Sequence, residues 1–377
     1  MDEAESRRWQ ALDLFKALAL LPMIAIHVQV WWFFADDKTY LGPPAGMTPE
    51  AARLFLDGIF RPFFRTFGTL ANLFPVAAGA ALRFALDPWW DGARGGLKDD
   101  CGPALWKVAI RATCLAALGF SINLLTWGPD GWSSWDVLPF VGLSSVVASL
   151  VLARSSVRAL LLGGACAVFF APSLRGMTWL AGDSYWRLAL LGSSSGDHFY
   201  PFFPWFGCFA YGLWLGHMKR STAGPAGRTF FKSVLGLGLA LTSVGVFSGD
   251  FLLSFDPSNI WGPTVFQPST AHIIGQLGAF TLVMALLDLR PTAPAPRYGW
   301  RSVLSRGILA IYAAHIIFGY RLTDWLNGSG SLWGLAAMIA GQLVAAYAVG
   351  AAAVWLRDRS RAGAPEKPGG HRGSGAG

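Results

Sequence analysis

Long apolar stretches alternate with short polar connections along the chain. An apolar run of about 18 to 22 residues with few charges is long enough for a helix to cross the hydrocarbon core of a bilayer. Such runs predict ten transmembrane helices, at residues 12–35, 67–87, 104–126, 136–153, 157–172, 202–218, 231–249, 269–288, 303–321 and 332–356. We therefore expect an all-α polytopic membrane protein with about ten transmembrane helices surrounding a central cavity.

The longest outer connection, residues 36–66, carries a further helix signal. Thr48 is a suitable N-cap, Pro49 follows at the first helical position and Glu50 lies in the first turn. The Leu and Phe positions that follow predict a helix lying on the membrane surface.

Composition agrees with this fold class. Of the 377 residues, 53% are hydrophobic, 14% are charged and 18 are Trp, which is too apolar and aromatic for an ordinary water-soluble domain. The expected organisation is a cytoplasmic N-terminal segment over residues 1–11, a transmembrane domain over 12–356 and a cytoplasmic tail over 357–377. The Gly, Pro and charge content of the tail predicts disorder.

The Lys and Arg residues are unevenly divided between the two sides of the predicted membrane domain. Residues 219–232 carry four of them on one side, whereas the connections 127–135 and 250–268 on the other side carry none. By the positive-inside rule, both termini are cytoplasmic in a multi-pass protein of the inner (plasma) membrane. This bias, with the attraction of anionic lipid, accounts for the formal net charge of +8. No basic stripe with interleaved aromatic residues suggests a nucleic-acid partner.

The cysteines give no sign of a metal centre or a redox pair. Cys101, Cys114, Cys166 and Cys208 are scattered, without a C-x-x-C spacing. We interpret them as small packing residues and expect no metal.

Two ionisable residues share one face of the first predicted helix, in the stretch KALALLPMIAIH from Lys16 to His27. At 100° per residue, eleven steps bring His27 to about 20° beyond three full turns and roughly 16 Å along the axis. Asp13 precedes Lys16 by one turn and can neutralise it. Taken alone, the pattern fits a lysine that snorkels to the interface and a packed histidine as well as it fits a functional site.

The Lys16-x10-His27 spacing resembles the Arg/Lys-x10-His signature of the transmembrane acyltransferases, which include the acyltransferase-3 family and the relatives of heparan-α-glucosaminide N-acetyltransferase. Four later stretches fit the same resemblance in the expected order, namely LANLFPVAAGAALRFAL (70–86), WDVLPFVGLSSVVASLVL (135–152), FYPFFPWFGCFAYGLWLG (199–216) and ILAIYAAHIIF (308–318). The similarity covers most of residues 8–356. Lys16 stands where arginine is commoner, and lysine lacks the planar fork that contacts phosphate or carboxylate with two bonds.

The resemblance implies transfer of an acyl group, usually acetyl, from a cytoplasmic acyl-CoA such as acetyl-CoA to a carbohydrate or glycolipid at the outer face. A pantetheine arm is of the order of the roughly 16 Å between Lys16 and His27. A donor whose phosphates rest near inner-face cations could therefore present its thioester in the outer half of the membrane.

Two histidines are the predicted catalytic residues. His27 would act as a general base on the attacking hydroxyl or amine, or would carry the acyl group covalently, and the sequence does not separate the two. His315, predicted in the outer half of a late helix with Tyr312 one turn away, could polarise the acyl carbonyl or position the acceptor. A purely structural hydrogen-bonded pair of Tyr312 and His315 is equally compatible.

The remaining candidates divide between the two substrates. For the acyl-CoA donor they are Lys16, Asp13, Arg111 and Arg83, each of which could instead pair or snorkel at the inner interface. For the acceptor they are Asn72, Asn123, Asp136, Asp197, His198 and Tyr312, most of which also suit interface anchors or turns.

Two other functions compete with acyl transfer. A transporter or flippase for a lipid-linked saccharide or small polar solute is the alternative, and it would be favoured by paired broken helices in two halves, which the sequence does not show. A non-catalytic membrane scaffold is the third. The sequence leaves the acceptor, the acyl chain length and the formation of a homo-oligomer open.

Overall fold

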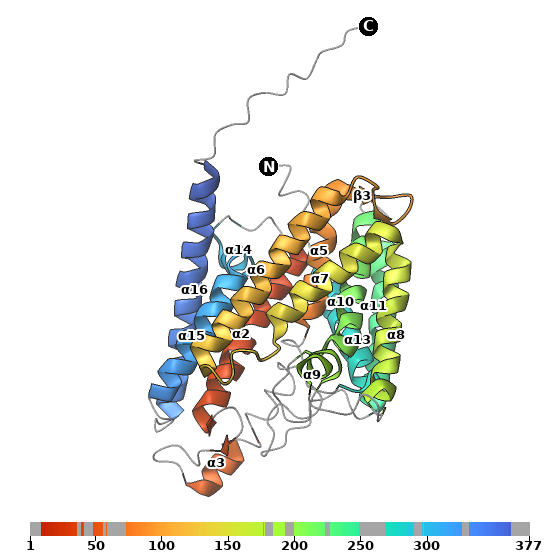
Figure 1. The fold of residues 1–377 in the computed structure, drawn as a ribbon. Helices are drawn as coiled ribbons and strands as arrows, with labels where there is room; N and C mark the ends of the chain where they lie inside the picture. Colours follow the sequence, from red (N-terminus) through yellow and green to blue (C-terminus); the bar gives the residue numbers. More distant parts are fainter. Residues whose placement is uncertain are drawn as a thin grey trace.

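The fold is that of a computed structural model of the chain. It describes residues 9–35, 39–40, 48–55, 58, 73–175, 177, 184–192, 200–222, 227–248, 268–289, 296, 298–325 and 332–362. Helices dominate these residues, and the strands among them form two short antiparallel pairs (Figure 1). The predicted all-α class is confirmed.

The helices are, in chain order, α2 (Gln10–Phe33), α3 (Pro49–Phe55), α5 (Phe74–Ala85), α6 (Gly102–Trp127), α7 (Val137–Arg154), α8 (Val157–Arg175), α9 (Tyr185–Leu191), α10 (Phe202–Ser221), α11 (Gly227–Phe247), α13 (Thr270–Leu289), α14 (Trp300–Arg306), α15 (Ile308–Trp325) and α16 (Leu332–Ala362). The strand pairs are β1 (Phe34–Ala35) with β2 (Thr39–Tyr40), and β3 (Trp90–Asp91) with β4 (Gly96–Leu97).

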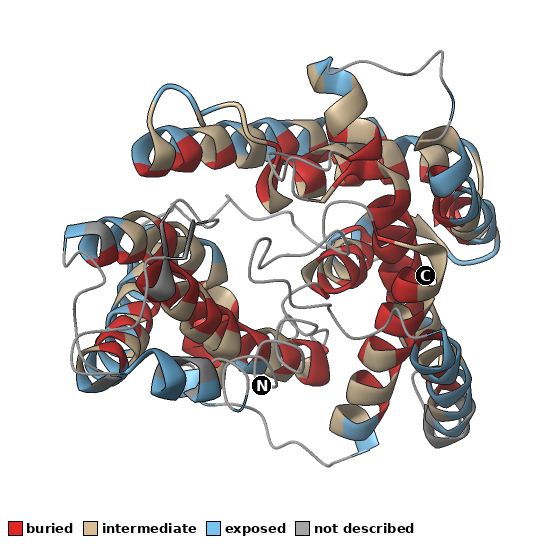
Figure 2. Ribbon diagram, turned by 90° about the horizontal axis from the view of Figure 1, so that it is seen from below, coloured by how far each residue is buried: buried red, intermediate tan, exposed pale blue. Residues whose placement is uncertain are grey.

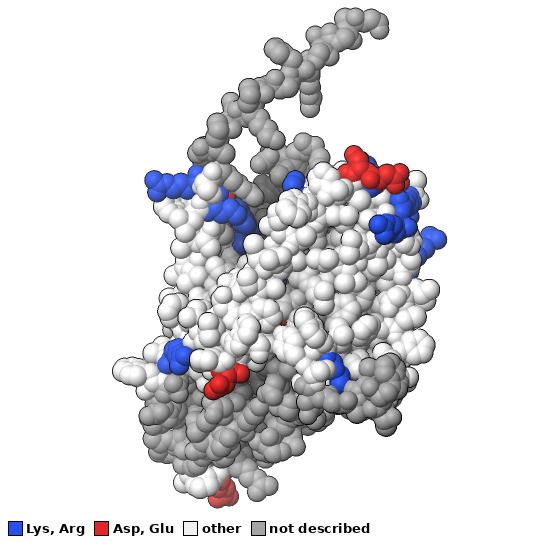
Figure 3. Space-filling view, in the orientation of Figure 1, with Lys and Arg blue, Asp and Glu red and all other residues white. Residues whose placement is uncertain are grey.

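The polytopic character is confirmed, but a count of ten spans is not. Within the described residues, six helices are long and apolar enough to cross a bilayer, and the bent pair α14–α15 makes a seventh. Of the other predicted spans, α5 is described over only 12 residues, and α10 and α11 are helices that are not among the seven. Figure 3 shows Lys and Arg gathered mainly at the end that holds β3–β4 and the C-terminal part of α16, above a broad band of uncharged surface.

Helix α3 begins as its sequence predicts. The Thr48 side-chain oxygen accepts a hydrogen bond from the Ala51 backbone amide at 3.2 Å, which satisfies one of the unpaired amides of the first turn. The structure therefore confirms Thr48 as the N-cap.

The predicted span 303–321 is broken rather than straight. It divides at Gly307 into α14 and α15, which are bent by 75°. A Cβ at Gly307 would lie 2.6 Å from Gly350 Cα in α16, so the break is held by a backbone contact that only glycine permits. His315 consequently lies seven residues beyond the start of α15, not twelve along one continuous helix.

Helix α2 lies at the centre of the described helices. Its first half, including Phe15 and Ala19, belongs to an apolar cluster with α5, α7, α10 and α13, whereas its second half, including Ile24 and Val28, packs in a second cluster with α15 and α16. Of its most apolar window, 61% is buried, compared with 28% for α6 and for α16. Figure 2 shows buried residues on the faces that helices turn toward one another and exposed residues on outer faces.

Helix α10 approaches α5 on one side and α8 on another at glycines. A Cβ at Gly79 would overlap the Phe209 carbonyl, one at Gly212 would overlap the Val76 carbonyl, and Gly207 meets Gly164. Small residues at such positions let helix backbones touch, which is a main source of association in membranes. Of the four cysteines, Cys101 and Cys208 are buried, in agreement with a packing role, and Cys114 and Cys166 are exposed.

The substitution Gly212→Ala tests this packing. The added methyl group overlaps the Val76 carbonyl, so α5 and α10 must separate, and we expect a loss of about 1–3 kcal/mol of stability. The measurement is the thermal unfolding midpoint of the purified protein in detergent. The control is Gly163→Ala on α8, where a Cβ meets nothing within 4 Å. Equal midpoints for the two variants would contradict the close α5–α10 contact.

Candidate active site

Two predicted residues far apart in the sequence, His27 and His315, are brought together between α2 and α15. His315 Nε2 lies 3.4 Å from His27 Nδ1, and the ring centroids are 5.2 Å apart. His315 is only 2% exposed and His27 is half-buried. The pair therefore lies inside the protein at the level of the second apolar cluster.

Backbone contacts indicate which nitrogen of each ring carries the proton. His27 Nδ1 lies 3.0 Å from the Met23 carbonyl oxygen, and His315 Nδ1 lies 3.2 Å from the Ile311 carbonyl oxygen. A carbonyl oxygen only accepts, so in both neutral rings we assign the proton to Nδ1. The Nδ1–H of His27 is then shared between the Met23 carbonyl and the more distant His315 Nε2, and His27 Nε2 bears the lone pair.

Aromatic side chains surround the two rings. Trp31, one turn beyond His27 on α2, stacks on the His27 ring with centroids 5.4 Å apart, and Tyr320 meets Trp31 edge-on at 5.9 Å. Tyr312 meets the His315 ring edge-on at 5.6 Å. Trp31 is not among the site residues predicted from the sequence. Its spacing of four residues from His27, which places both on one helix face, is the signal that could have identified it.

A hydrogen bond between Tyr312 and Asp136 extends the site to α7. The Tyr312 hydroxyl donates to Asp136 Oδ2 at 2.5 Å, and Asp136 Oδ1 accepts from the Val137 amide at 2.6 Å as the N-cap of α7. Burial raises the pKa of the Asp136 carboxyl, and the hydrogen bonds from Tyr312 and Val137 oppose that shift. Four predicted residues, His27, His315, Tyr312 and Asp136, thus form one group.

A second polar group, the Arg83 cluster, lies at the end of the molecule near β3–β4. It consists of Arg83, Asp87, Trp90, His217 and Arg220. The Asp87 carboxylate pairs with Arg83 at 2.5 Å and with Arg220 at 3.0 Å, and the Arg83 guanidinium lies 3.7 Å from the centre of the Trp90 ring. The His217 ring lies 5.2 Å from that of Trp90.

The Arg83 cluster has unused hydrogen-bonding capacity. Arg83 Nε, Trp90 Nε1 and His217 Nδ1 are buried and make no hydrogen bond within the described part of the chain. Two guanidinium groups face one carboxylate, so the cluster also has an excess of positive charge. Buried polar atoms of this kind are costly unless a further group satisfies them. Of this cluster, only Arg83 is a candidate predicted from the sequence, because the contacts join the end of α5, the turn after it and the end of α10.

A family model described as heparan-alpha-glucosaminide N-acetyltransferase, catalytic, matches residues 50–253, more than half of the chain. The chain belongs to this family. No curated protein matches it. Membership confirms the predicted resemblance to the transmembrane acyltransferases and supports membrane acetyltransferase activity in a multi-pass membrane protein.

The region matched to the N-acetyltransferase family includes Arg83, Asn123 and Asp136 but not His27, Tyr312 or His315. The candidate catalytic role of the two histidines therefore rests on their geometry in this structure and not on the family match. The family match does favour an acetyltransferase over the transporter and scaffold readings of the sequence.

The other predicted site residues that the structure describes lie apart from the group of His27, His315, Tyr312 and Asp136. The Asp13 carboxylate accepts from Ser305 Oγ at 2.6 Å, and Lys16 is half-buried on α2. Arg111 is exposed on α6. Asn123 is fully buried and donates to the Ser134 carbonyl at 2.7 Å, which anchors the connection after α6.

Three of the acceptor candidates, Asn72, Asp197 and His198, lie outside the described residues. Within the described ranges, no group of three or more His, Cys, Asp or Glu is placed to hold a metal ion.

The Tyr312–Asp136 hydrogen bond gives a stability prediction. Tyr312→Phe leaves the buried Asp136 carboxyl without its side-chain donor, and we expect a loss of about 1–3 kcal/mol. The unfolding midpoint in detergent measures this. Tyr347→Phe is the control, because its hydroxyl donates at 3.3 Å to the Tyr298 carbonyl at an exposed position. An effect of Tyr312→Phe no larger than the control would show that the bond contributes nothing.

Proposed function

We propose that the protein transfers an acetyl group from cytoplasmic acetyl-CoA to a hydroxyl or amine of a carbohydrate-bearing acceptor on the outer side of the inner membrane. The observation that carries this proposal is the histidine pair, in which backbone carbonyls direct both Nδ1 protons and leave the lone pair of His27 on Nε2. That is the form of imidazole that accepts a proton. Family membership supports the reaction class.

In the proposed reaction, His27 Nε2 takes the proton from the acceptor hydroxyl or amine as its oxygen or nitrogen attacks the thioester carbonyl. The carbon–sulfur bond then breaks, the acetyl group stays on the acceptor, and the coenzyme A sulfur leaves with the proton from His27. The Nδ1–H of His27 is shared between the Met23 carbonyl oxygen at 3.0 Å and His315 Nε2 at 3.4 Å. His315 therefore acts as a positioning residue that orients His27 and stabilises its charged form, as the third member of a catalytic triad does.

The donor is proposed to enter from the end that carries the Arg83 cluster. Arg83 and Arg220 supply positive charge, and the unpaired N–H donors of Arg83 and Trp90 suit phosphate oxygens. Lys16, with Asp13 and Arg111, is proposed to assist at the same end. Lys16 lies roughly 16 Å along α2 from His27, which leaves room for a pantetheine arm between phosphates and thioester.

The substitution His27→Ala removes the proposed base. With labelled acetyl-CoA and an acceptor extract from cell membranes, we expect transfer to fall by about 10²–10⁴-fold. His272→Ala is the matched control, because His272 is also a buried histidine but lies on α13 and contacts Gln276. Equal transfer by wild type and a folded His27→Ala would eliminate the proposed role. Label retained on the protein without acceptor would indicate the covalent route instead.

His315→Gln serves as the companion variant. Loss of the orienting ring is expected to lower kcat with little change in KM for acetyl-CoA and to alter the pH profile of kcat. A purely structural role would lower the amount of folded enzyme without altering that profile.

The proposed donor site is tested with Arg220→Gln. Loss of one charge-assisted hydrogen bond, worth about 1.5–3 kcal/mol, is expected to raise KM for acetyl-CoA by roughly ten-fold or more, with kcat little changed. Lys219→Gln is the control, since Lys219 is the adjacent cation and pairs with Asp288 at 2.7 Å. A KM that is unchanged in Arg220→Gln would place the phosphates elsewhere.

A further inference from the structure

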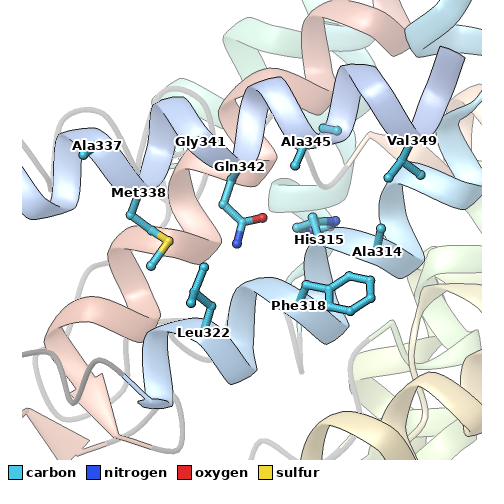
Figure 4. A pocket seen from close by; sticks show the side chains of 11 residues that line it. Ala314, His315, Phe318, Leu322, Ala337, Met338, Gly341, Gln342, Ala345 and Val349 are labelled. Carbon is cyan, nitrogen blue, oxygen red and sulfur yellow. The ribbon is translucent and has the colours of Figure 1, made fainter. Parts of the chain in front are cut away.

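A groove of about 290 Å³ runs between α15 and α16. Its walls are apolar, with Phe318, Leu322, Met338 and Val349 among them, and its polar members are His315 and Gln342. Figure 4 shows the His315 ring and the Gln342 amide lying between the two helices, with the apolar side chains along them. The same ring that contacts His27 therefore forms part of the groove.

The groove lies within the apolar length of both helices. Its lining residues fall inside the candidate spans Ile308–Thr323 and Trp333–Ser360. Phe318 is 68% exposed, so the groove is open on the outer surface of the helix pair. In a membrane, this surface faces hydrocarbon, and the groove is reached from the bilayer.

Shape and size restrict the occupant. The lining runs from Ala314 to Leu322 on α15 and from Ala337 to Val349 on α16, which corresponds to roughly 12–18 Å along the helices and so to about half of the ~30 Å hydrocarbon thickness. The volume is at the lower limit for a small-molecule pocket. A single hydrocarbon chain fits this long, narrow and apolar space, whereas a saccharide does not.

We propose that this groove binds the hydrocarbon chain of a lipid-linked acceptor, which reaches the histidine pair laterally from the bilayer. The inference rests on the proposed acetyl transfer and names its acceptor class. A groove that holds only a bulk membrane lipid needs apolar lining residues alone. This groove is also lined by His315, the partner of His27.

Gly341 offers a way to fill the groove without disturbing the protein. It is exposed on α16 and lines the groove, and a Cβ there meets nothing within 4 Å. In Gly341→Phe the ring therefore occupies the space proposed for the chain. Gly163→Phe is the matched control, because Gly163 is also exposed, on α8, and a Cβ there likewise meets nothing within 4 Å. Gly341→Leu is a smaller second variant, and the unfolding midpoints of all three establish that they fold.

Binding is measured in phosphatidylcholine nanodiscs with a dodecyl glucosaminide that carries a photoreactive diazirine at the end of its chain. We expect labelled peptides from α15 and α16 in the wild type, at least five-fold less label there in Gly341→Phe, and no change in Gly163→Phe. Label spread over the lipid-facing surface and insensitive to Gly341→Phe would overturn the proposal, because the chain would then sit in the bilayer only.

Activity separates this inference from the proposed function. With membrane lipid extract as acceptor, Gly341→Phe is expected to lower acetyl transfer into the organic phase by at least ten-fold, and Gly163→Phe to leave it unchanged. If His27→Ala abolishes transfer but Gly341→Phe transfers at the wild-type rate, the groove is not an acceptor site and the proposed function stands. If His27→Ala transfers as well as the wild type, the proposed function fails whatever the labelling.

Discussion

Helix α2 is enclosed by other helices along most of its length. This burial requires the polar side chains of the candidate site on α2 to find hydrogen-bond partners within the protein. Phe15, Leu20, Ile24 and Val28 are each no more than 1% exposed, and α2 contacts α5, α13, α14, α15 and α16. A polar side chain that turns inward on such a helix is removed from water, and leaving it unpaired is costly. Asp13 is therefore met by Ser305 and His27 by a backbone carbonyl and His315.

The same helix joins two parts of the chain that the family match separates. Helices α5 to α11 lie largely within the matched residues, whereas α2 and α14 to α16 lie outside them. The Tyr312–Asp136 bond connects α15, outside the match, to α7 within it, and α2 contacts α5 within the match as well as α14, α15 and α16 outside it. The group formed by His27, His315, Tyr312 and Asp136 thus depends on both parts, although each histidine lies outside the match.

The sequence predicts local features of this protein better than long-range ones. The helices, the Thr48 cap and the placement of Lys16 and His27 on one face follow from periodicity and spacing, which are properties of a single segment. The contact between His27 and His315 joins residues 288 positions apart, and no local pattern encodes it. The break at Gly307 depends on Gly350 in another helix. The Arg83 cluster combines residues from α5, the following turn and α10. Neither feature can be predicted from the sequence of a single segment.

The chemistry of the histidine pair follows from where charge can be tolerated in such a helix bundle. A carboxylate is the usual group that orients a catalytic histidine, but a permanent charge in the middle of a membrane span is expensive unless it is fully paired. A second imidazole can orient the first while both remain neutral, since the carbonyls of Met23 and Ile311 fix the Nδ1 protons. The carboxylate of the group, Asp136, lies instead just before α7, where the Val137 amide and the Tyr312 hydroxyl stabilise it. The carboxyl group thus lies at the helix end, and neutral polar groups lie within the span.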